Sequence, residues 1–447
     1  MKNYIINNAK IINEGKIVEA SICIEHGFIS KIESHPIFKE GYTIIDATGL
    51  YMLPGLIDDQ VHFREPGLTH KGNIYSESKA AVAGGITSFM EMPNTVPSAV
   101  TIELLEEKYQ IGKASSLANY SFFMGTTNDN LDELLRLNPL DVCGVKIFMG
   151  SSTGNMIVDN PVSLENIFKQ VKMLIATHCE DDPMIKQNQQ RFIEKYGNAL
   201  DSTSHYLIRS EEACYKSSSY AVELAKKHNT RLHILHISTA KELSLFDNNI
   251  PSKDKRITAE ACLHHLWFSN EDYASKGNFI KWNPAIKTAH DREAILQAVI
   301  DNRIDVLATD HAPHTIEEKS KSYLEAPSGG PLVQHALVAL LEMYHQNKIT
   351  LEKIVEKTSH TVADLFQIDK RGYIREGYYA DLVLVDLNQP WQVNKSNILY
   401  HCAWSPFEGN TFKSKVMKTF VNGHLAYDNG VFDETRKGNR LSFNRNL

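Results

Sequence analysis

The sequence predicts an α/β protein, a (β/α)8 TIM-like barrel with a small β domain built from both chain termini. Short apolar runs alternate with helical patterns through the middle of the chain, which is typical of parallel βα units. Eight such runs occur, the number that closes a barrel. Both ends of the chain differ from the middle, because they carry alternating segments separated by turns.

The two ends of the chain are predicted to form one composite β domain, residues 1–51 plus 371–447. The first end contains "KIVEASICI" (16–24) and "FISKIESH" (28–35), with Gly and Asn turns between them. The other contains "YADLVLVDL" (379–387) and "KVMKTFVNGHLAYDNGVF" (415–432), in which Asn-Gly pairs predict hairpins. Residues 52–370 are then the barrel.

The barrel strands are predicted from the apolar runs in chain order. They lie at 55–59, 86–92, 120–125, 142–150, 172–178, 231–237, 256–261 and 304–310. The segments between most of them carry a helical pattern, at 75–85, 101–114, 163–171, 210–229 and 291–302. Further helical segments follow the eighth run, at 331–346, 350–359 and 361–366, and are expected to cover the barrel.

Composition excludes several classes of partner. The formal charge of -7 and the lack of a basic block argue against nucleic-acid or anionic-membrane binding. The first 20 residues have the pattern of strands broken by polar residues and are not expected to be a signal peptide, no apolar stretch reaches spanning length, and the six cysteines are scattered without a C-x-x-C pair. We therefore expect a cytoplasmic protein with reduced thiols and a small-molecule substrate, and the sequence is compatible with a homodimer.

Polar, metal-competent side chains follow the predicted strands. Barrel active sites form where strands end, so these side chains should converge. They are His62, Arg64, Asn94, Lys146, His178, His236, His264, His265, Asp310 and His314. Imidazole and carboxylate ligands without thiolates suit Zn²⁺, with Mn²⁺, Co²⁺ and Fe²⁺ as alternatives.

Lys146 is the unusual member of this set, because an ammonium repels a metal ion. It fits a metal site only as a neutral amine carbamylated by CO₂, which gives a carboxylate that can bridge two metals. From the residues alone, a lysine that binds a phosphate or carboxylate is the simpler interpretation.

The ordered motifs resemble those of the cyclic amidohydrolases, and among them the dihydroorotases. They are "DDQVHFREPG" (58–67), "EMPNT" (91–95), "KIFMGSSTG" (146–154), "ATHCE" (176–180), "LHIST" (235–239), "WNPAIKT" (282–288), "ATDHAPH" (308–314) and "SPFEG" (405–409). The resemblance implies that Lys146 is a carbamylated bridge between two zinc ions and that His62, His178, His236 and Asp310 are metal ligands. It also implies that Arg64, Asn94, Asn283 and His314 hold the substrate, and that the backbone at Gly329 closes over the ring.

The implied reaction is the reversible zinc-dependent cyclisation of N-carbamoyl-L-aspartate to (S)-dihydroorotate, a step of pyrimidine biosynthesis that leads to UMP. In the hydrolytic direction a metal-bound hydroxide attacks the ring amide, and Asp310 shuttles the proton. Two alternatives are a dihydropyrimidinase, hydantoinase or allantoinase, whose substrates lack the ring carboxylate that Arg64 would bind, and a non-catalytic homologue that serves as a scaffold for aspartate transcarbamoylase.

Gln60 departs from the family pattern. It stands where the resemblance requires the first histidine of a His-x-His pair with His62. An amide oxygen is a weak zinc ligand beside imidazole. We therefore expect the metal bound by His62 and Asp310 to be weak, partly occupied or missing, and the metal bound by Lys146, His178 and His236 to keep its ligands.

Overall fold

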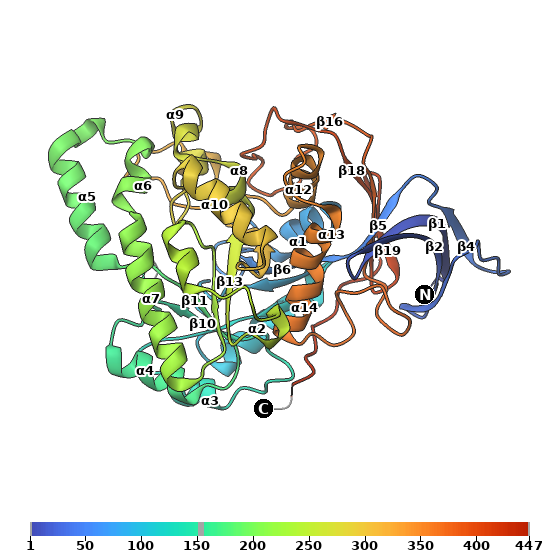
Figure 1. The fold of residues 1–447 in the computed structure, drawn as a ribbon, viewed down its shortest axis with the longest axis horizontal. Helices are drawn as coiled ribbons and strands as arrows, with labels where there is room; N and C mark the ends of the chain where they lie inside the picture. Colours follow the sequence, from blue (N-terminus) through green and yellow to red (C-terminus); the bar gives the residue numbers. More distant parts are fainter. Residues whose placement is uncertain (1, 151–155, 446–447) are drawn as a thin grey trace.

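The computed structural model describes residues 2–150 and 156–445, and the barrel and the terminal β sheet lie side by side in it (Figure 1). Among these residues the eight predicted barrel strands are all found. They are β6 (Leu56–Val61), β7 (Ile86–Glu91), β8 (Asn119–Phe122) continued by β9 (Met124–Gly125), β10 (Val145–Phe148), β11 (Ile175–His178), β12 (Leu232–Ile234), β13 (Ile257–Cys262) and β14 (Val306–Ala308). The predicted fold class is confirmed.

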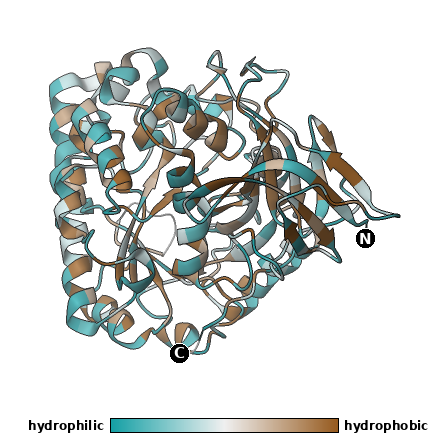
Figure 2. Cartoon of the chain, turned by 45° about the vertical axis from the view of Figure 1, so that its right-hand side comes forward, coloured by the Kyte–Doolittle hydropathy of each residue, from teal (hydrophilic) through white to brown (hydrophobic). Residues whose placement is uncertain are grey.

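The barrel strands pair in parallel and in chain order. One run of pairs joins β6, β7 and β8, and a second joins β9 through β14. The ring closes where Val61 pairs with His311 and the His62 N–H donates to the His311 carbonyl at 2.7 Å. Both faces of these strands are covered, so their apolar residues are buried, and apolar colouring gathers on the inner strands (Figure 2).

The five helices predicted between strands are present, and each begins at a capping side chain. They are α1 (Ile74–Ala83), α2 (Ile102–Ser115), α4 (Pro161–Gln170), α7 (Glu211–His228) and α10 (Ala289–Ile300). Their caps are Asn73, Thr101, Asn160, Ser210 and Thr288, whose side chains accept a backbone N–H of the first turn.

The sequence pattern missed one long helix, α5 (Asp182–Tyr196). Ile185 is the one buried residue of this helix, and Met184, Phe192 and Ile193 beside it are only partly buried, so its apolar face is narrow. The remaining helices are short or follow the last barrel strand: α3 (Leu131–Leu135), α6 (His205–Ile208), α8 (Leu263–Trp267), α9 (Tyr273–Lys276), α11 (Ile316–Lys319), α12 (Ala336–His345), α13 (Leu351–Val355) and α14 (Thr361–Phe366). None of the helices in the described ranges is both long and apolar enough to cross a membrane.

The two ends of the chain share one nine-stranded sheet. Its strands are β1 (Tyr4–Asn13), β2 (Lys16–Glu25), β3 (Phe28–Glu33), β4 (Thr43–Asp46), β5 (Tyr51–Pro54), β15 (Leu382–Asp386), β18 (Lys415–Val421), β19 (His424–Asp428) and β20 (Val431–Phe432). A separate pair, β16 (Trp391–Gln392) and β17 (Thr411–Phe412), lies between β15 and β18 in the chain.

A buried carboxylate fixes the sheet to the barrel. Asp381 forms an ion pair with Arg371 and accepts the Asn422 N–H at 2.7 Å. It also accepts Nδ2–H of Asn119, which belongs to barrel strand β8, at 3.3 Å. The same carboxylate therefore joins the terminal sheet to the third barrel position.

The final described residues leave the sheet and return to the barrel. Arg440 pairs with Tyr120 and Phe443 with Ile368 in isolated bridges. The buried Arg445 guanidinium donates to four backbone carbonyls, at distances of 2.7–3.2 Å: those of Pro139, Val142, Cys143 and Phe366.

We predict that Arg445→Ala destabilises the fold, because it leaves several buried carbonyls without a donor. The expected loss is about 2–3 kcal/mol of unfolding free energy, measured as a lower thermal or denaturant midpoint. Arg436→Ala is the matched control, because Arg436 is exposed on the same tail. Equal midpoints for the two variants would contradict an anchoring role for Arg445.

Candidate metal centre

One cavity at the C-terminal ends of the barrel strands collects the side chains predicted for the site, except His264 and His265. Its open volume is about 1010 Å³. The predicted residues that line it are Gln60, His62, Arg64, Asn94, Lys146, His178, His236, Asn283, Asp310, His314 and Gly329. They come from six different barrel strand ends and from the segments that follow β13 and β14, as barrel geometry requires.

His178 and His236 form one half of the centre. The His178 Nε2–H donates to Glu180 Oε2 at 2.9 Å, which leaves Nδ1 facing His236 Nε2 at 3.0 Å. Burial lowers the pKa of His236 well below its ordinary value and keeps the ring neutral, as a metal ligand must be. Two imidazole nitrogens at this separation can bind one zinc ion.

Lys146 lies beside this pair and is 1 % exposed. No carboxylate of the described residues lies within ion-pair distance of its amine. Burial lowers the pKa of Lys146 to about 7, so a large fraction of the amine is neutral near pH 7. A neutral buried amine is the form that can react with CO₂, and the residues present therefore fit a carbamate.

Gln60, His62 and Asp310 form the other half. The His62 Nδ1–H donates to Asn94 Oδ1 at 2.8 Å, and its Nε2 lies 3.2 Å from Asp310 Oδ1. The Gln60 amide also donates Nε2–H to Asp310 Oδ1, at 3.2 Å. The glutamine thus turns its donor, rather than its oxygen, toward the position of a metal between His62 and Asp310.

Arg64 supplies a buried positive charge on the cavity wall. It is 7 % exposed, and its Nε–H donates to the Pro313 carbonyl at 3.0 Å. Its guanidinium lies 3.1 Å from His314 Nε2, and no described carboxylate forms an ion pair with it. Burial lowers the Arg64 pKa to about 10, which still leaves the side chain charged at neutral pH. The cavity therefore offers an unpaired cation to an anionic group.

Two buried lysines hold the loop that forms the far wall. Lys319 donates to the carbonyls of Pro327 and Gly329 at 2.9 and 2.8 Å, and Lys281 donates to those of Tyr323 and Ala326 at 2.6 Å. Gly329 has a φ of +125°, and a Cβ there would lie 2.5 Å from the Ala312 carbonyl oxygen. Only glycine fits this position of the loop.

Asn283 and its neighbours form the remaining wall. The Asn283 Oδ1 is buried and has no hydrogen-bond partner among the described residues, so it is free for a ligand. Trp282 stacks on His264 with ring centroids 4.5 Å apart. His264 and His265 are buried outside the cavity lining, so these two predicted side chains do not join the site.

Three residues of the centre adopt a left-handed backbone that side chains rarely take. Their φ values are 72° at Arg64, 41° at His236 and 48° at Asp310. Such local strain concentrates at functional sites because the surrounding structure enforces it.

The sequence pattern missed two charged residues of the centre, Glu180 and Arg209. Glu180 is fully buried and forms ion pairs with both His178 and Arg209, and it orients the imidazole. The sequence could have indicated Glu180, because it stands two residues after His178 in "ATHCE". Nothing in the sequence indicated Arg209. Part of the motif "KIFMGSSTG", residues 151–154, lies outside the described residues.

Comparison with known proteins assigns a family to this architecture. Residues 51–426 match the amidohydrolase family. A dihydroorotase from Methanosphaera stadtmanae is 32% identical over 439 residues, which cover 97% of this chain and 98% of the relative. A dihydroorotase from Halobacterium salinarum is 33% identical over 87% of this chain and 89% of the relative.

Solved structures agree with the fold. An L-hydantoinase (dihydropyrimidinase) from Arthrobacter aurescens superimposes with a TM-score of 0.91 and 25% identity, over 97% of each chain. A dihydropyrimidinase from Brevibacillus agri gives a TM-score of 0.90 at 22% identity, over 99% of this chain and 100% of the other. The chain therefore belongs to the amidohydrolase family and is a hydrolase that acts on cyclic amide bonds.

Proposed function

We propose that the chain is a dihydroorotase, which interconverts N-carbamoyl-L-aspartate and (S)-dihydroorotate. The observation that carries the proposal is Arg64, a buried guanidinium on the cavity wall without an ion-pair partner among the described residues. Dihydroorotate carries a ring carboxylate that a planar guanidinium can bind through two parallel hydrogen bonds. The rings of dihydrouracil, hydantoin and allantoin offer no such anion.

The curated relatives support this substrate, since several with 30% identity or more are named dihydroorotase. The solved neighbours are named hydantoinase or dihydropyrimidinase, and their agreement supports the shared fold and reaction class. Substrate choice within the family then depends on the side chains that meet the ring, and Arg64 is an arginine among them with no ion pair to a described carboxylate.

We further propose that the centre is built for zinc. His178, His236 and a carbamate on Lys146 would hold one ion, and His62 with Asp310 would hold a weaker second one. Bound zinc supplies a Lewis acid that lowers the pKa of water and polarises an amide carbonyl.

The protein's own groups supply orientation and proton transfer. Glu180 fixes the tautomer of His178, and Asn94 fixes that of His62. Burial raises the pKa of Asp310 to about 7, so this carboxylate can take a proton and return it near neutral pH. We assign Asp310 to carry the proton to the ring nitrogen that leaves. Asn283 and the backbone of Ser328 and Gly329 face the same cavity and would hold the ring.

The substrate assignment is tested with purified protein on a panel of cyclic amides. We expect turnover of dihydroorotate to exceed that of dihydrouracil, hydantoin and allantoin. Arg64→Gln should lower kcat/KM for dihydroorotate by about 100-fold or more, because a buried charge pair is lost. Zinc content, measured by mass spectrometry, should stay unchanged.

Arg64→Lys is the matched control, because it keeps the charge and loses the planar fork; we expect an intermediate activity. Turnover of uncharged rings only, or an equal loss of zinc in Arg64→Gln, would contradict the assignment.

Asp310→Asn keeps the size of the side chain and removes the base. We expect kcat to fall by about 10³-fold, within the range that general acid–base groups contribute. Asp305→Asn is the control, because Asp305 is also fully buried but pairs with Lys255 away from the cavity. Retained turnover in Asp310→Asn would rule out the proton-transfer role.

Gln60→His restores an imidazole at the weakened half of the centre. We expect zinc between His62 and Asp310 to bind roughly tenfold or more tightly, seen as a stronger anomalous diffraction peak at that position. Gln60→Ala serves as the control and should show no gain. A fully occupied peak there in the unmodified protein would show that the glutamine does not weaken the site.

A further inference from the structure

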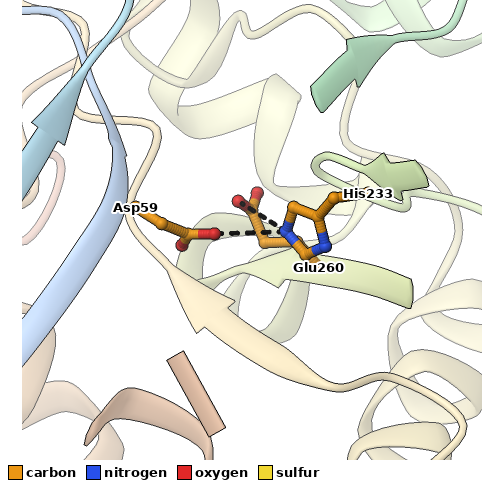
Figure 3. Close-up of side chains that lie close together, drawn as sticks. All are labelled: Asp59, His233 and Glu260. Carbon is orange, nitrogen blue, oxygen red and sulfur yellow. Dashed lines mark ion pairs between the residues drawn. The ribbon is translucent and has the colours of Figure 1, made fainter. Parts of the chain in front are cut away.

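A second cluster of metal-competent side chains lies inside the barrel, beneath the cavity. It consists of Asp59 on β6, His233 on β12 and Glu260 on β13, and each is 0% exposed (Figure 3). Asp59 and His233 stand three residues before His62 and His236 on the same two chain segments. None of the three lines the cavity. The cluster is therefore a separate, deeper layer of the barrel interior.

The hydrogen bonds around His233 determine which ring nitrogen carries its proton. The Thr258 hydroxyl donates to the Leu232 carbonyl at 3.2 Å, so its oxygen accepts from His233 Nδ1–H at 2.8 Å. The other nitrogen, Nε2, then points into the cluster. It lies 3.1 Å from Asp59 Oδ2 and 3.9 Å from Glu260 Oε2 (Figure 3).

The atoms that converge on this point lack hydrogen bonds. Among the described residues, both oxygens of Asp59, Oε2 of Glu260 and Nε2 of His233 have no hydrogen-bond partner. The other oxygen of Glu260 is already engaged, because it accepts the His236 N–H at 2.9 Å. Two buried carboxylates that face a nitrogen lone pair repel one another and are costly to bury unless a positive charge lies between them.

We propose that Asp59, His233 and Glu260 bind a divalent transition-metal ion of the Zn²⁺ class as a structural site. One imidazole nitrogen with carboxylate oxygens is a zinc-type donor set. The donor atoms all lie within 4.8 Å of one another. Bonds of about 2.0–2.2 Å to a central ion would place neighbouring donors roughly 3.3 Å apart, and His233 Nε2 lies 3.1 and 3.9 Å from the two carboxylate oxygens. A 2+ ion also neutralises the two carboxylates.

The rival occupant is a proton on His233. Burial disfavours a charged ring, but the Asp59 and Glu260 carboxylates outweigh it and raise the pKa of His233 to about 9. A charged ring would form an ion pair with Asp59 Oδ2 at 3.1 Å, but the Nε2–H would not meet hydrogen-bond geometry with either carboxylate, and this favours the metal. A proton would also leave the remaining oxygens of the cluster without a partner, whereas an ion can bind oxygens from both carboxylates at once.

Such an ion would tie three strands together under the catalytic layer. Its ligands come from the first, sixth and seventh barrel positions, and Glu260 also holds the backbone of His236. Because the cluster is fully buried, its ion should exchange far more slowly than one in the open cavity. Resistance to chelators therefore separates the two kinds of zinc.

The test counts zinc per chain in purified full-length protein before and after dialysis against a chelator, with Zn²⁺ as the only added metal. We expect one zinc per chain to resist removal while dihydroorotate turnover is lost with the labile zinc. In Asp59→Asn the resistant zinc should be absent. Asp305→Asn, a matched change at another fully buried carboxylate, should retain it.

An anomalous diffraction map of the unmodified protein, recorded at the zinc edge, tests the position even where Asp59→Asn does not fold. A peak between Asp59, His233 and Glu260 supports the proposal. No peak there after refolding with excess Zn²⁺, or resistant zinc unchanged in Asp59→Asn, overturns it. The proposed function is judged separately, because it depends on the labile zinc and on substrate turnover.

Discussion

Charge inside the barrel governs how this structure can be assembled, because a buried charge is tolerated only when an opposite charge or a hydrogen-bond partner faces it. Most interior groups meet that condition directly. Glu91 lies 2.9 Å from Lys108, Lys255 lies 2.8 Å from Asp305, and the Asp58 carboxylate accepts the Thr309 hydroxyl at 2.6 Å. These pairs occupy positions around the barrel wall.

Two places in the described chain hold buried charges that the protein's own groups pair incompletely. Arg64 and Lys146 face the cavity, where a substrate anion and CO₂ would complete them. Asp59 and Glu260 face His233 one layer deeper. Incomplete pairing thus coincides with the places where we propose ligands, and the fully paired residues form the frame that holds them.

Much of this architecture could be predicted from the sequence, since barrel strands buried on both faces appear as apolar runs and polar residues at their ends mark the cavity. The prediction failed where that signal is absent. The helix α5 buries little apolar surface. Arg209 reaches the cavity from the segment between α6 and α7, so no strand end points to it. Asp59 and Glu260 sit within strands rather than at their ends, and their convergence on His233 depends on which side of each strand faces inward.

The shared terminal sheet bears on the order in which the chain can reach its final form. Strand β5 pairs with β15, so Pro54 meets Leu382 only after most of the polypeptide has been made. Ribosomes add about 5–20 residues per second, so the edge of β5 waits on the order of tens of seconds for its partner. During translation that edge is an unpaired strand able to associate with other chains. A nascent chain of this design is therefore most exposed to aggregation before its last strands emerge, and folding chaperones would act chiefly on that stage.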